Sequence, residues 1–428
     1  MMNKTVVRTV LLLSVICMSA AAQIGSGIDM GVGTRARAFA GNHTAVANDM
    51  SAAYWNPAAL AFLPVREFQL SFDGMRTFGT CDITGDRVDV PAGAKNDDYK
   101  DRLRLGSIGA MTAMPTVRGG LTIAAAYERP LTFDDFSVYE YRLPDDTENI
   151  GADYVRYGDL NRLSVAFGVQ VAPNISAGLA VSVVTGSSET ILDQKKNGGP
   201  YNDYKIKHSY LGYSFTLGAL YLPTEYLKLG MRLNTLMSLD VKESWTTKYA
   251  EGEPIGGFSG QKFGPLSGKA YMAPHGAVGA GFTLPWLTSA LDIRFTMPYT
   301  FVMPGENIPD RFQARDFKMG GGLGFEVPVP ATSLVLRTGY SFDDYDLYPL
   351  VHKMEGDDVF WEEGDGFEII RNKHTLTFGF GYFTSGFGLE LSYSWQTWGL
   401  AHQDDESAIR IEQAYSNHRV MAGIIFRY

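Results

Sequence analysis

The sequence predicts an all-β protein, a 14-stranded antiparallel transmembrane β-barrel with an N-terminal hatch, or plug, inside the lumen. Three observations support this: apolar residues alternate with a period of two, short connections alternate with long ones, and a non-alternating segment precedes the first strand. The composition agrees. Of 428 residues only 45% are hydrophobic and the mean hydropathy is −0.09, which argues against a bundle of transmembrane helices, since each helix needs about 20 apolar residues in a row.

Residues 1–22 predict export. Lys4 and Arg8 give a positive start, an apolar stretch follows, and Ala20-Ala21-Ala22 offers a cleavage site, which is the pattern of a secretory signal peptide. Its removal leaves 35 basic against 47 acidic residues, a net charge of −12, which disfavours nucleic acid as a partner. One cysteine, Cys81, remains, so no disulfide within the chain is expected.

The alternation is clearest at 163–183. Every second residue from Leu163 to Val171 is apolar, and the pattern resumes from Ile175 to Val183 after a short connection that contains Pro173. Two such runs around a tight connection are typical of a β-hairpin with one apolar face. The last run of this kind ends the chain at Tyr428.

Fourteen runs of this kind can be counted. The expected strands are 66–77, 103–114, 118–131, 159–172, 174–187, 207–222, 226–243, 271–284, 288–300, 316–328, 332–343, 373–383, 386–399 and 418–428. Connections of a few residues alternate with others of roughly a dozen to about thirty. An even strand number, short periplasmic turns and long extracellular loops are the signature of an outer-membrane barrel with both termini in the periplasm.

The face opposite the apolar one is small or charged, as in the series Lys228, Gly230, Arg232 and Asn234. Lipid would surround the apolar face, and the second face would line the lumen. The 13% of aromatic residues fits girdles at the two membrane interfaces. The alternative is a secreted β-sandwich or propeller, in which the apolar face would be the core.

Residues 23–65 do not alternate and predict a hatch that fills the lumen. This segment contains Asn56-Pro57-Ala58, and above all through this motif it resembles the FadL/TodX family of outer-membrane transporters for hydrophobic compounds. The resemblance includes Gly33, Arg35-Ala36, Ala40-Gly41, Ala45, Ala47, Asp49 and Ser51-Ala52. It extends over the whole chain as an architecture: signal peptide 1–22, hatch 23–65 and barrel 66–428, which ends on an aromatic residue.

The resemblance implies a transport mechanism. In the family, a hydrophobic ligand is caught among extracellular loops and enters an apolar pocket in the barrel. The hatch then moves, and the ligand leaves sideways through a gap at a kinked third strand. Here the third expected strand begins with Arg118-Gly119-Gly120, and paired glycines permit a bend. Gly119 and Gly120 are therefore expected at the lateral opening. The alternative is an ordinary loose start to a strand.

Charged residues predict contacts between hatch and wall. The hatch carries Asp29, Arg35, Arg37 and Asp49. By strand direction, six charged residues face inward in the periplasmic half of the wall: Arg232, Asp292, Arg294, Glu326, Arg337 and Glu390. Because buried charges persist only when they are paired, ion pairs between the two sets are expected. The alternative is a hydrated lumen with loosely solvated charges.

The connection 344–372 is strongly acidic around Phe360, Trp361 and Phe367. A solvated acidic loop is favoured, and a cation bridge to lipopolysaccharide or an aromatic landing site for ligand are alternatives. No enzyme, cofactor or metal site is predicted. Gly31-Val32-Gly33 lacks the third glycine of a dinucleotide fingerprint, and the seven histidines lack metal-ligand spacing.

Two functions follow from these observations. The first is uptake of hydrophobic compounds, such as long-chain fatty acids or hydrocarbons, by capture in the barrel and lateral exit into the bilayer. The alternative is a non-transporting barrel of the PorV type that serves as a protein-docking or secretion accessory. An aqueous porin fits less well, because the hatch would obstruct its pore. A monomer in the bacterial outer membrane is expected, with the bilayer, lipopolysaccharide and a hydrophobic ligand as partners.

Overall fold

The computed structural model of the chain describes residues 31–83, 86–90, 103–133, 135–142, 149–196, 199–249, 262–297, 317–344, 350–355, 358–363, 367–403 and 410–428. The predicted signal peptide and Asp29 lie outside these residues. Within these ranges, no helix is both long and apolar enough to cross a membrane.

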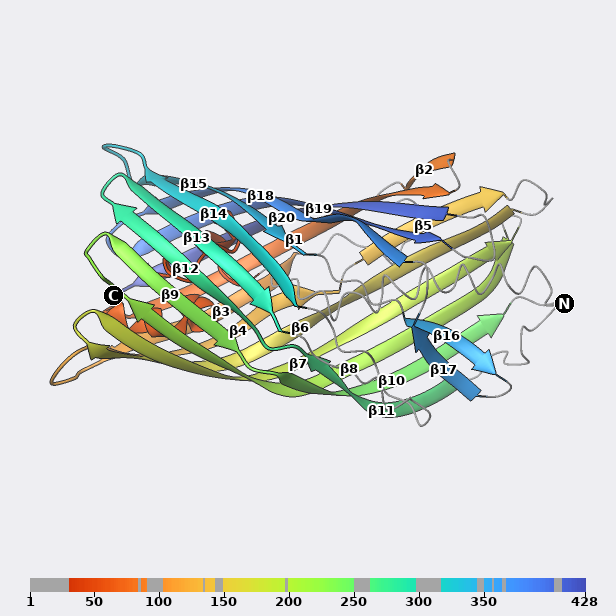
Figure 1. Cartoon of the computed structure of the whole chain (residues 1–428), viewed down its shortest axis with the longest axis horizontal. Helices are drawn as coiled ribbons and strands as arrows, with labels where there is room; N and C mark the ends of the chain where they lie inside the picture. Colours follow the sequence, from red (N-terminus) through yellow and green to blue (C-terminus); the bar gives the residue numbers. More distant parts are fainter. Residues whose placement is uncertain are drawn as a thin grey trace.

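The fold is the predicted closed barrel of fourteen antiparallel strands (Figure 1). It is closed because β1 pairs with β3 on one side and with β20 on the other. The fourteen passes are β1 (Glu67–Ile83), β3 (Arg104–Met114), β4 (Leu121–Thr132), β6 (Asn149–Ala172), β7 (Ile175–Lys196), β8 (Gly199–Tyr221), β9 with β10 (Leu227–Asn234 and Met237–Tyr249), β11 with β12 (Lys262–Met272 and His275–Leu284), β13 (Leu287–Thr296), β14 (Lys318–Pro328), β15 (Leu334–Asp343), β18 (Phe367–Phe383), β19 (Phe387–Gln403) and β20 (Arg410–Arg427).

The strands differ from the expected ones in three ways. Two passes are interrupted, one between β9 and β10 and the other between β11 and β12, where Pro274 lacks an N–H to donate to a ladder. Strands β6, β7, β8 and β20 continue about eight to ten residues further into the connections expected at 132–158, 188–206 and 400–417. Additional short strands lie in the long connections: β2 (Asp86–Val90), β5 (Asp135–Arg142), β16 (Leu350–Glu355) and β17 (Asp358–Glu363).

The two faces of the barrel wall have the predicted chemistry. Apolar side chains such as Leu163 and Phe167 point outward and are exposed on the protein's outer surface. Their sequence neighbours Ser164 and Ala166 point inward and are buried. The sheet therefore presents its apolar face to the surroundings, which is the arrangement of a barrel in lipid rather than in water.

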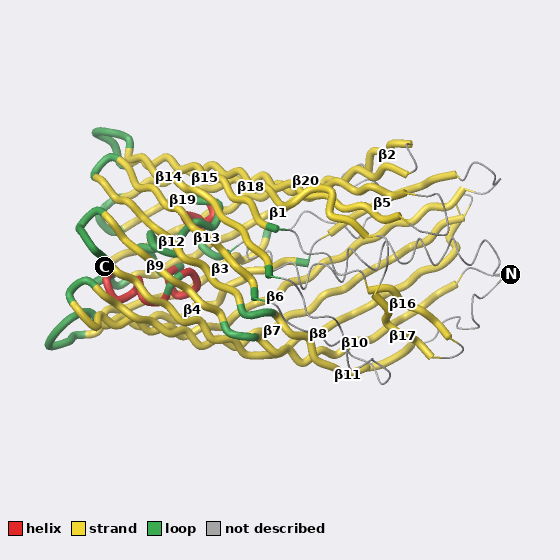
Figure 2. Tube along the Cα trace, in the orientation of Figure 1, coloured by secondary structure: helices red, strands yellow, loops and turns green. Residues whose placement is uncertain are grey.

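The N-terminal segment, residues 31–65, lies inside the barrel near the end that holds the short turns and the C terminus (Figure 2). It contains α2 (Thr34–Ala38), α3 (Ala52–Trp55) and the 3₁₀ helix η1 (Pro57–Phe62). Small residues of this segment, with Met50 and Trp55, form a buried cluster against inward residues of β3, β4, β6, β7 and β8. The small side chain of alanine lets the backbone of this segment come close to the barrel wall, which explains why the segment is rich in alanine.

Candidate functional site

Asn56 anchors the Asn56-Pro57-Ala58 motif to the wall. Its side-chain amide donates to the carbonyl of Thr44 within the segment at 2.8 Å and to the carbonyl of Ala219 in β8 at 3.0 Å. The side-chain oxygen Oδ1 of Asn56 accepts a hydrogen bond from the N–H of Ala58 at 3.1 Å and so caps η1. Pro57 takes the first position of this helix. The motif thus starts a helix and fixes it to the barrel with one side chain.

A row of glycines receives this motif. Gly168 of β6, Gly178 of β7 and Gly218 of β8 stand opposite one another in the ladder and face inward. A Cβ added to any of the three would overlap atoms of Asn56, Pro57 or Ala58. The glycines therefore let the backbone of the segment touch the backbone of the wall. Ser176 adds a hydrogen bond of 2.8 Å to the carbonyl of Ala58.

An ion-pair network joins the segment to the opposite wall. Arg35 donates through Nε and Nη2 to both oxygens of Glu326 at 2.8 and 3.0 Å, a bidentate pair. Arg337 donates to the same Glu326 at 2.7 Å and to Glu390 at 2.8 Å. Two arginines thus alternate with two glutamates, and all four side chains are largely removed from water. Ion pairing is the arrangement that such burial demands.

Three further wall residues contact the described part of the segment through hydrogen bonds and ring contacts. Asp292 accepts from the backbone N–H groups of His43 and Thr44 at 2.9 and 3.0 Å. Arg294 donates to the side chain of Asn42 at 3.1 Å and pairs with Asp343 of the wall. The third, Arg232, places its guanidinium over the rings of Tyr54 and Trp55.

Two predicted hatch residues bind within the segment. Asp49 accepts from the N–H of Ser51 at 2.9 Å, and Arg37 donates to the carbonyl of Gly31 at 3.1 Å. His43 is fully buried between Phe39 and Trp55. This burial, reinforced by the charge of Arg35, lowers the pKa of His43 to about 3, so the ring is neutral near pH 7.

Above the segment lies a cavity of about 160 Å³. One side is apolar, with Leu131, Leu160, Val184, Met237 and Met272 from β4, β6, β7, β10 and β11. The rest of the lining includes many neutral residues, together with six arginine and lysine side chains and two aspartates. The cations are Arg37, Arg162, Arg232, Arg294, Lys318 and Lys373. Such a cavity suits a molecule that is apolar at one end and anionic at the other.

Gly119 and Gly120 lie in the turn before β4, not in the strand, so the expected start at residue 118 was wrong. Gly119 has a φ of +74°, which ends the turn and delays the strand to Leu121. A Cβ on Gly120 would overlap the carbonyl of Ala61, so this glycine makes room for the N-terminal segment. The irregularity in β4 lies further along, where the register with β6 shifts between Glu128 and Leu131.

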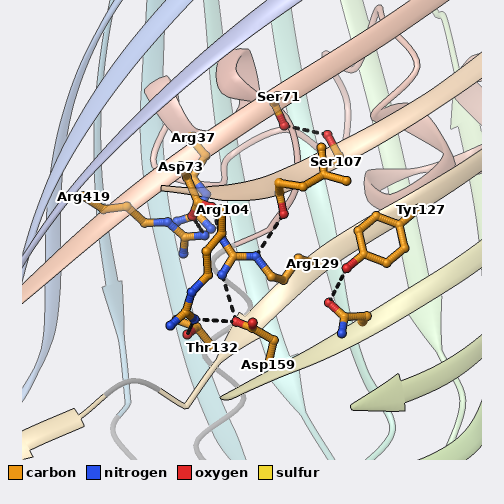
Figure 3. Close-up of polar contacts among 12 residues, drawn as sticks. Arg37, Ser71, Asp73, Arg104, Ser107, Tyr127, Arg129, Thr132, Asp159 and Arg419 are labelled. Carbon is orange, nitrogen blue, oxygen red and sulfur yellow. Dashed lines mark hydrogen bonds and ion pairs between the residues drawn. The ribbon is translucent and has the colours of Figure 1, made fainter. Parts of the chain in front are cut away.

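A second charge cluster lies at this irregularity (Figure 3). Arg129 contacts both Asp73 of β1 and Asp159 of β6, while Arg419 of β20 pairs with Asp73. Arg104 of β3 pairs with Asp159 at 2.9 Å. The ion pairs predicted from strand direction lie in the periplasmic half of the wall and do not include this cluster. Charged residues within otherwise alternating strands were the available signal.

The side chains of the acidic connection 344–372 lie largely outside the described residues, although its backbone includes the β16–β17 hairpin. Among the residues that the structure describes, no three His, Cys, Asp or Glu side chains are grouped to hold a metal ion.

A β-barrel with a lipid-facing apolar surface and a segment inside its lumen defines a class, the plugged outer-membrane channels. Within that class, the chain belongs to the family of outer membrane protein transport proteins (OMPP1/FadL/TodX), whose model matches residues 10–297. This family consists of outer-membrane channels for hydrophobic compounds rather than enzymes, and its members are monomeric. Membership places the chain in the bacterial outer membrane.

Solved structures share the fold. A Pseudomonas aeruginosa FadL homologue superposes with a TM-score of 0.62 at 15% identity over 93% of this chain and 98% of its own. The P. putida toluene transporter TodX gives a TM-score of 0.60 at 14% identity, with 94% and 99% covered. The Ralstonia pickettii toluene transporter TbuX gives 0.56 at 12% identity, also with 94% and 99% covered. No match to the sequence was found among curated proteins.

Proposed function

We propose that this protein takes up hydrophobic compounds that carry an acidic head group, such as long-chain fatty acids, rather than neutral hydrocarbons. The cavity above the N-terminal segment carries this proposal, because its lining combines a continuous apolar side with an excess of cations. An alkyl chain placed against Leu160, Val184 and Met237 would be removed from water, and a carboxylate would lie among cationic side chains.

In this proposal residues 31–65 are a movable hatch that closes the periplasmic end, and the ligand leaves sideways into the bilayer. The irregularity of β4 at Glu128–Leu131 supports an exit there, because Leu131 also lines the cavity. Gly120 serves instead as space for the hatch, and Gly119 ends the turn that precedes β4. A cavity with an apolar side favours transport over a docking accessory of the PorV type, whose lumen would be filled by side chains.

The test compares two valine variants on the same strand. Val184 is fully buried and lines the cavity, whereas Val181 lies on the same strand and faces outward. Val184→Phe fills the apolar side and is expected to lower uptake of a radiolabelled fatty acid about tenfold in cells that lack other transporters, since a lost ligand position of 1–2 kcal/mol has this effect. Val181→Phe is expected to transport normally.

The proposal fails if both valine variants transport as the unmodified protein does. It also fails if native mass spectrometry of the extracted barrel detects no bound acid and deletion causes no growth defect on fatty acids.

A further inference from the structure

Two hydrogen-bonded pairs of tyrosine and histidine lie on the outer face of the barrel. The hydroxyl oxygen of Tyr340 in β15 is 2.8 Å from Nδ1 of His374 in β18. The hydroxyl oxygen of Tyr393 in β19 is 2.7 Å from Nδ1 of His418 in β20. In the second pair the other ring nitrogen also has a partner, because Nε2 of His418 is 3.1 Å from Oγ of Ser416, two residues earlier on the same strand.

The hydrogen bonds around Ser416 assign a role to each group. The indole of Trp395 can only donate, and its Nε1 donates to Oγ of Ser416 at 2.8 Å. The hydroxyl hydrogen of Ser416 can then point at Nε2 of His418, while the N–H at Nδ1 of this ring donates to Tyr393. A nucleophile, a base and a group that orients the base are thus within hydrogen-bond distance, which is the arrangement that activates serine for acyl transfer.

This group of side chains lies where the apolar outer face of the wall ends. Towards the periplasmic end of β20, Val420 and Phe426 are apolar and exposed on the outer face. In the other direction the alternation of β20 brings Glu412 to the same face. Ser416 and His418 lie between them and are half-buried. In a membrane this is the level of the aromatic girdle at the outer interface, where the ester bonds of glycerophospholipids also lie.

A cation lies beside the histidine. Arg76 of β1 is directly opposite His418 in the ladder and is exposed. Its guanidinium carbon is 5.6 Å from the ring centre of Phe78, and that ring packs edge-on against His418 with 5.1 Å between ring centres. Because a guanidinium group matches the geometry of a phosphate, the neighbourhood suits a lipid that carries both an ester bond and a phosphate.

We propose that Ser416 and His418 form a hydrolytic site that cleaves acyl ester bonds of glycerophospholipids in the outer leaflet, as a second activity beside transport. Oγ of Ser416 attacks the ester carbonyl carbon while its proton passes to Nε2 of His418, and the N–H of Trp395 lies beside the oxyanion that forms. His418 then gives the proton to the leaving alcohol oxygen. The lysophospholipid departs, and the acyl group remains on Ser416.

Water completes the reaction. Its oxygen attacks the acyl carbon while His418 accepts its proton, and the proton returns to Oγ of Ser416 as the fatty acid leaves. The activity does not depend on the proposed uptake, because these side chains face outward and lie outside the described lining of the cavity. Its product nevertheless belongs to the class of compound that the proposed function takes up.

The experiment uses the purified full-length protein in mixed micelles with phosphatidylethanolamine that carries radiolabelled acyl chains, and it measures the fatty acid released. Ser416→Ala is expected to lower release to the rate without protein, and His418→Gln to lower it at least a hundredfold, the usual contribution of a general base. The matched control is His374→Gln, which alters the other pair, where Asn372 occupies the position of the serine. It should leave the rate unchanged.

A fluorophosphonate probe, which bonds covalently to activated serines, identifies the nucleophile. Mass spectrometry should find it on Ser416 of the unmodified protein. Tyr393 acts only through His418 and is a positioning residue. Tyr393→Phe removes the acceptor of the ring N–H and is expected to lower the maximal labelling rate about tenfold. The probe concentration that gives half the maximal rate should stay the same, whereas a general disturbance of the surface would change both quantities.

Two results overturn the proposal. One is fatty acid release that survives Ser416→Ala, and the other is a fluorophosphonate that does not label Ser416. In either case the hydrogen bonds among these side chains serve only to satisfy polar groups within the girdle. Should Ser416→Ala fail to assemble, as a heat-modifiability gel would show, labelling of the unmodified protein and release by His418→Gln decide.

Discussion

Glu326 shows at the scale of a single residue how the N-terminal segment is held. It is the carboxylate between Arg35 of the segment and Arg337 of the wall, and it binds both. A guanidinium group has five N–H donors and no acceptor, so each arginine needs an acceptor while it remains in the lumen. The segment and the wall are therefore coupled through one side chain that belongs to β14.

Glu326→Gln is expected to loosen the segment. The change removes the negative charge but keeps the shape, and it leaves two buried guanidinium groups with Glu390 as the remaining carboxylate. Breaking a buried pair in this way costs about 3–5 kcal/mol. In planar bilayers, the variant should open to ions far more often than the unmodified protein. Glu225→Gln, in an exposed turn, is the control, and equal open probabilities for both variants would contradict a holding role for Glu326.

At the scale of elements, η1 packs closely against the inner face of the strands β6, β7 and β8. Gly168, Gly178 and Gly218 form one row across them, and each glycine touches the motif that starts η1. The row places backbone against backbone, so that Asn56 can reach Ala219. Substitution here tests whether the fit of two elements, rather than one bond, positions the segment.

Gly178→Ala is expected to displace η1 while the barrel still forms. The added Cβ would overlap the backbone between Pro57 and Ala58, and neither side can rotate away. Overpacking of this kind typically costs about 1–3 kcal/mol. Limited proteolysis should then cleave residues 31–65 faster than in the unmodified protein. Gly321→Ala is the matched control, because its Cβ would come no closer than 3.0 Å to another atom. Equal cleavage of both variants would contradict the fit.

The strands were predictable from the sequence because apolar residues alternate with small or polar residues along them. All fourteen passes follow from the two-residue period, because each strand meets lipid on one face and the lumen on the other. The period says nothing about which residues meet across the lumen. Arg35 and Glu326 are 291 positions apart, and their pairing depends on barrel shear and on how the segment folds. The same holds for Arg129, whose partners lie on strands that are distant in sequence.

At the scale of the whole molecule, the barrel and its contents are stabilised by different interactions. The ladder from β1 to β20 closes on itself without residues 31–65. The segment, in contrast, is held by side chains and close packing on the inner wall. The movement of residues 31–65 in the proposed function would therefore leave the wall intact.

Deletion of residues 23–65 is therefore expected to give a folded but open barrel. The inward charges that the segment now covers would become hydrated, and the ladder would remain closed. The variant should keep its heat-modifiable migration on gels and show continuous ion conductance in planar bilayers, whereas the full-length protein conducts rarely. Loss of heat-modifiability would mean that the segment is part of the fold rather than its gate. A folded barrel that stays non-conducting would place the closure of the lumen in the wall and loops instead.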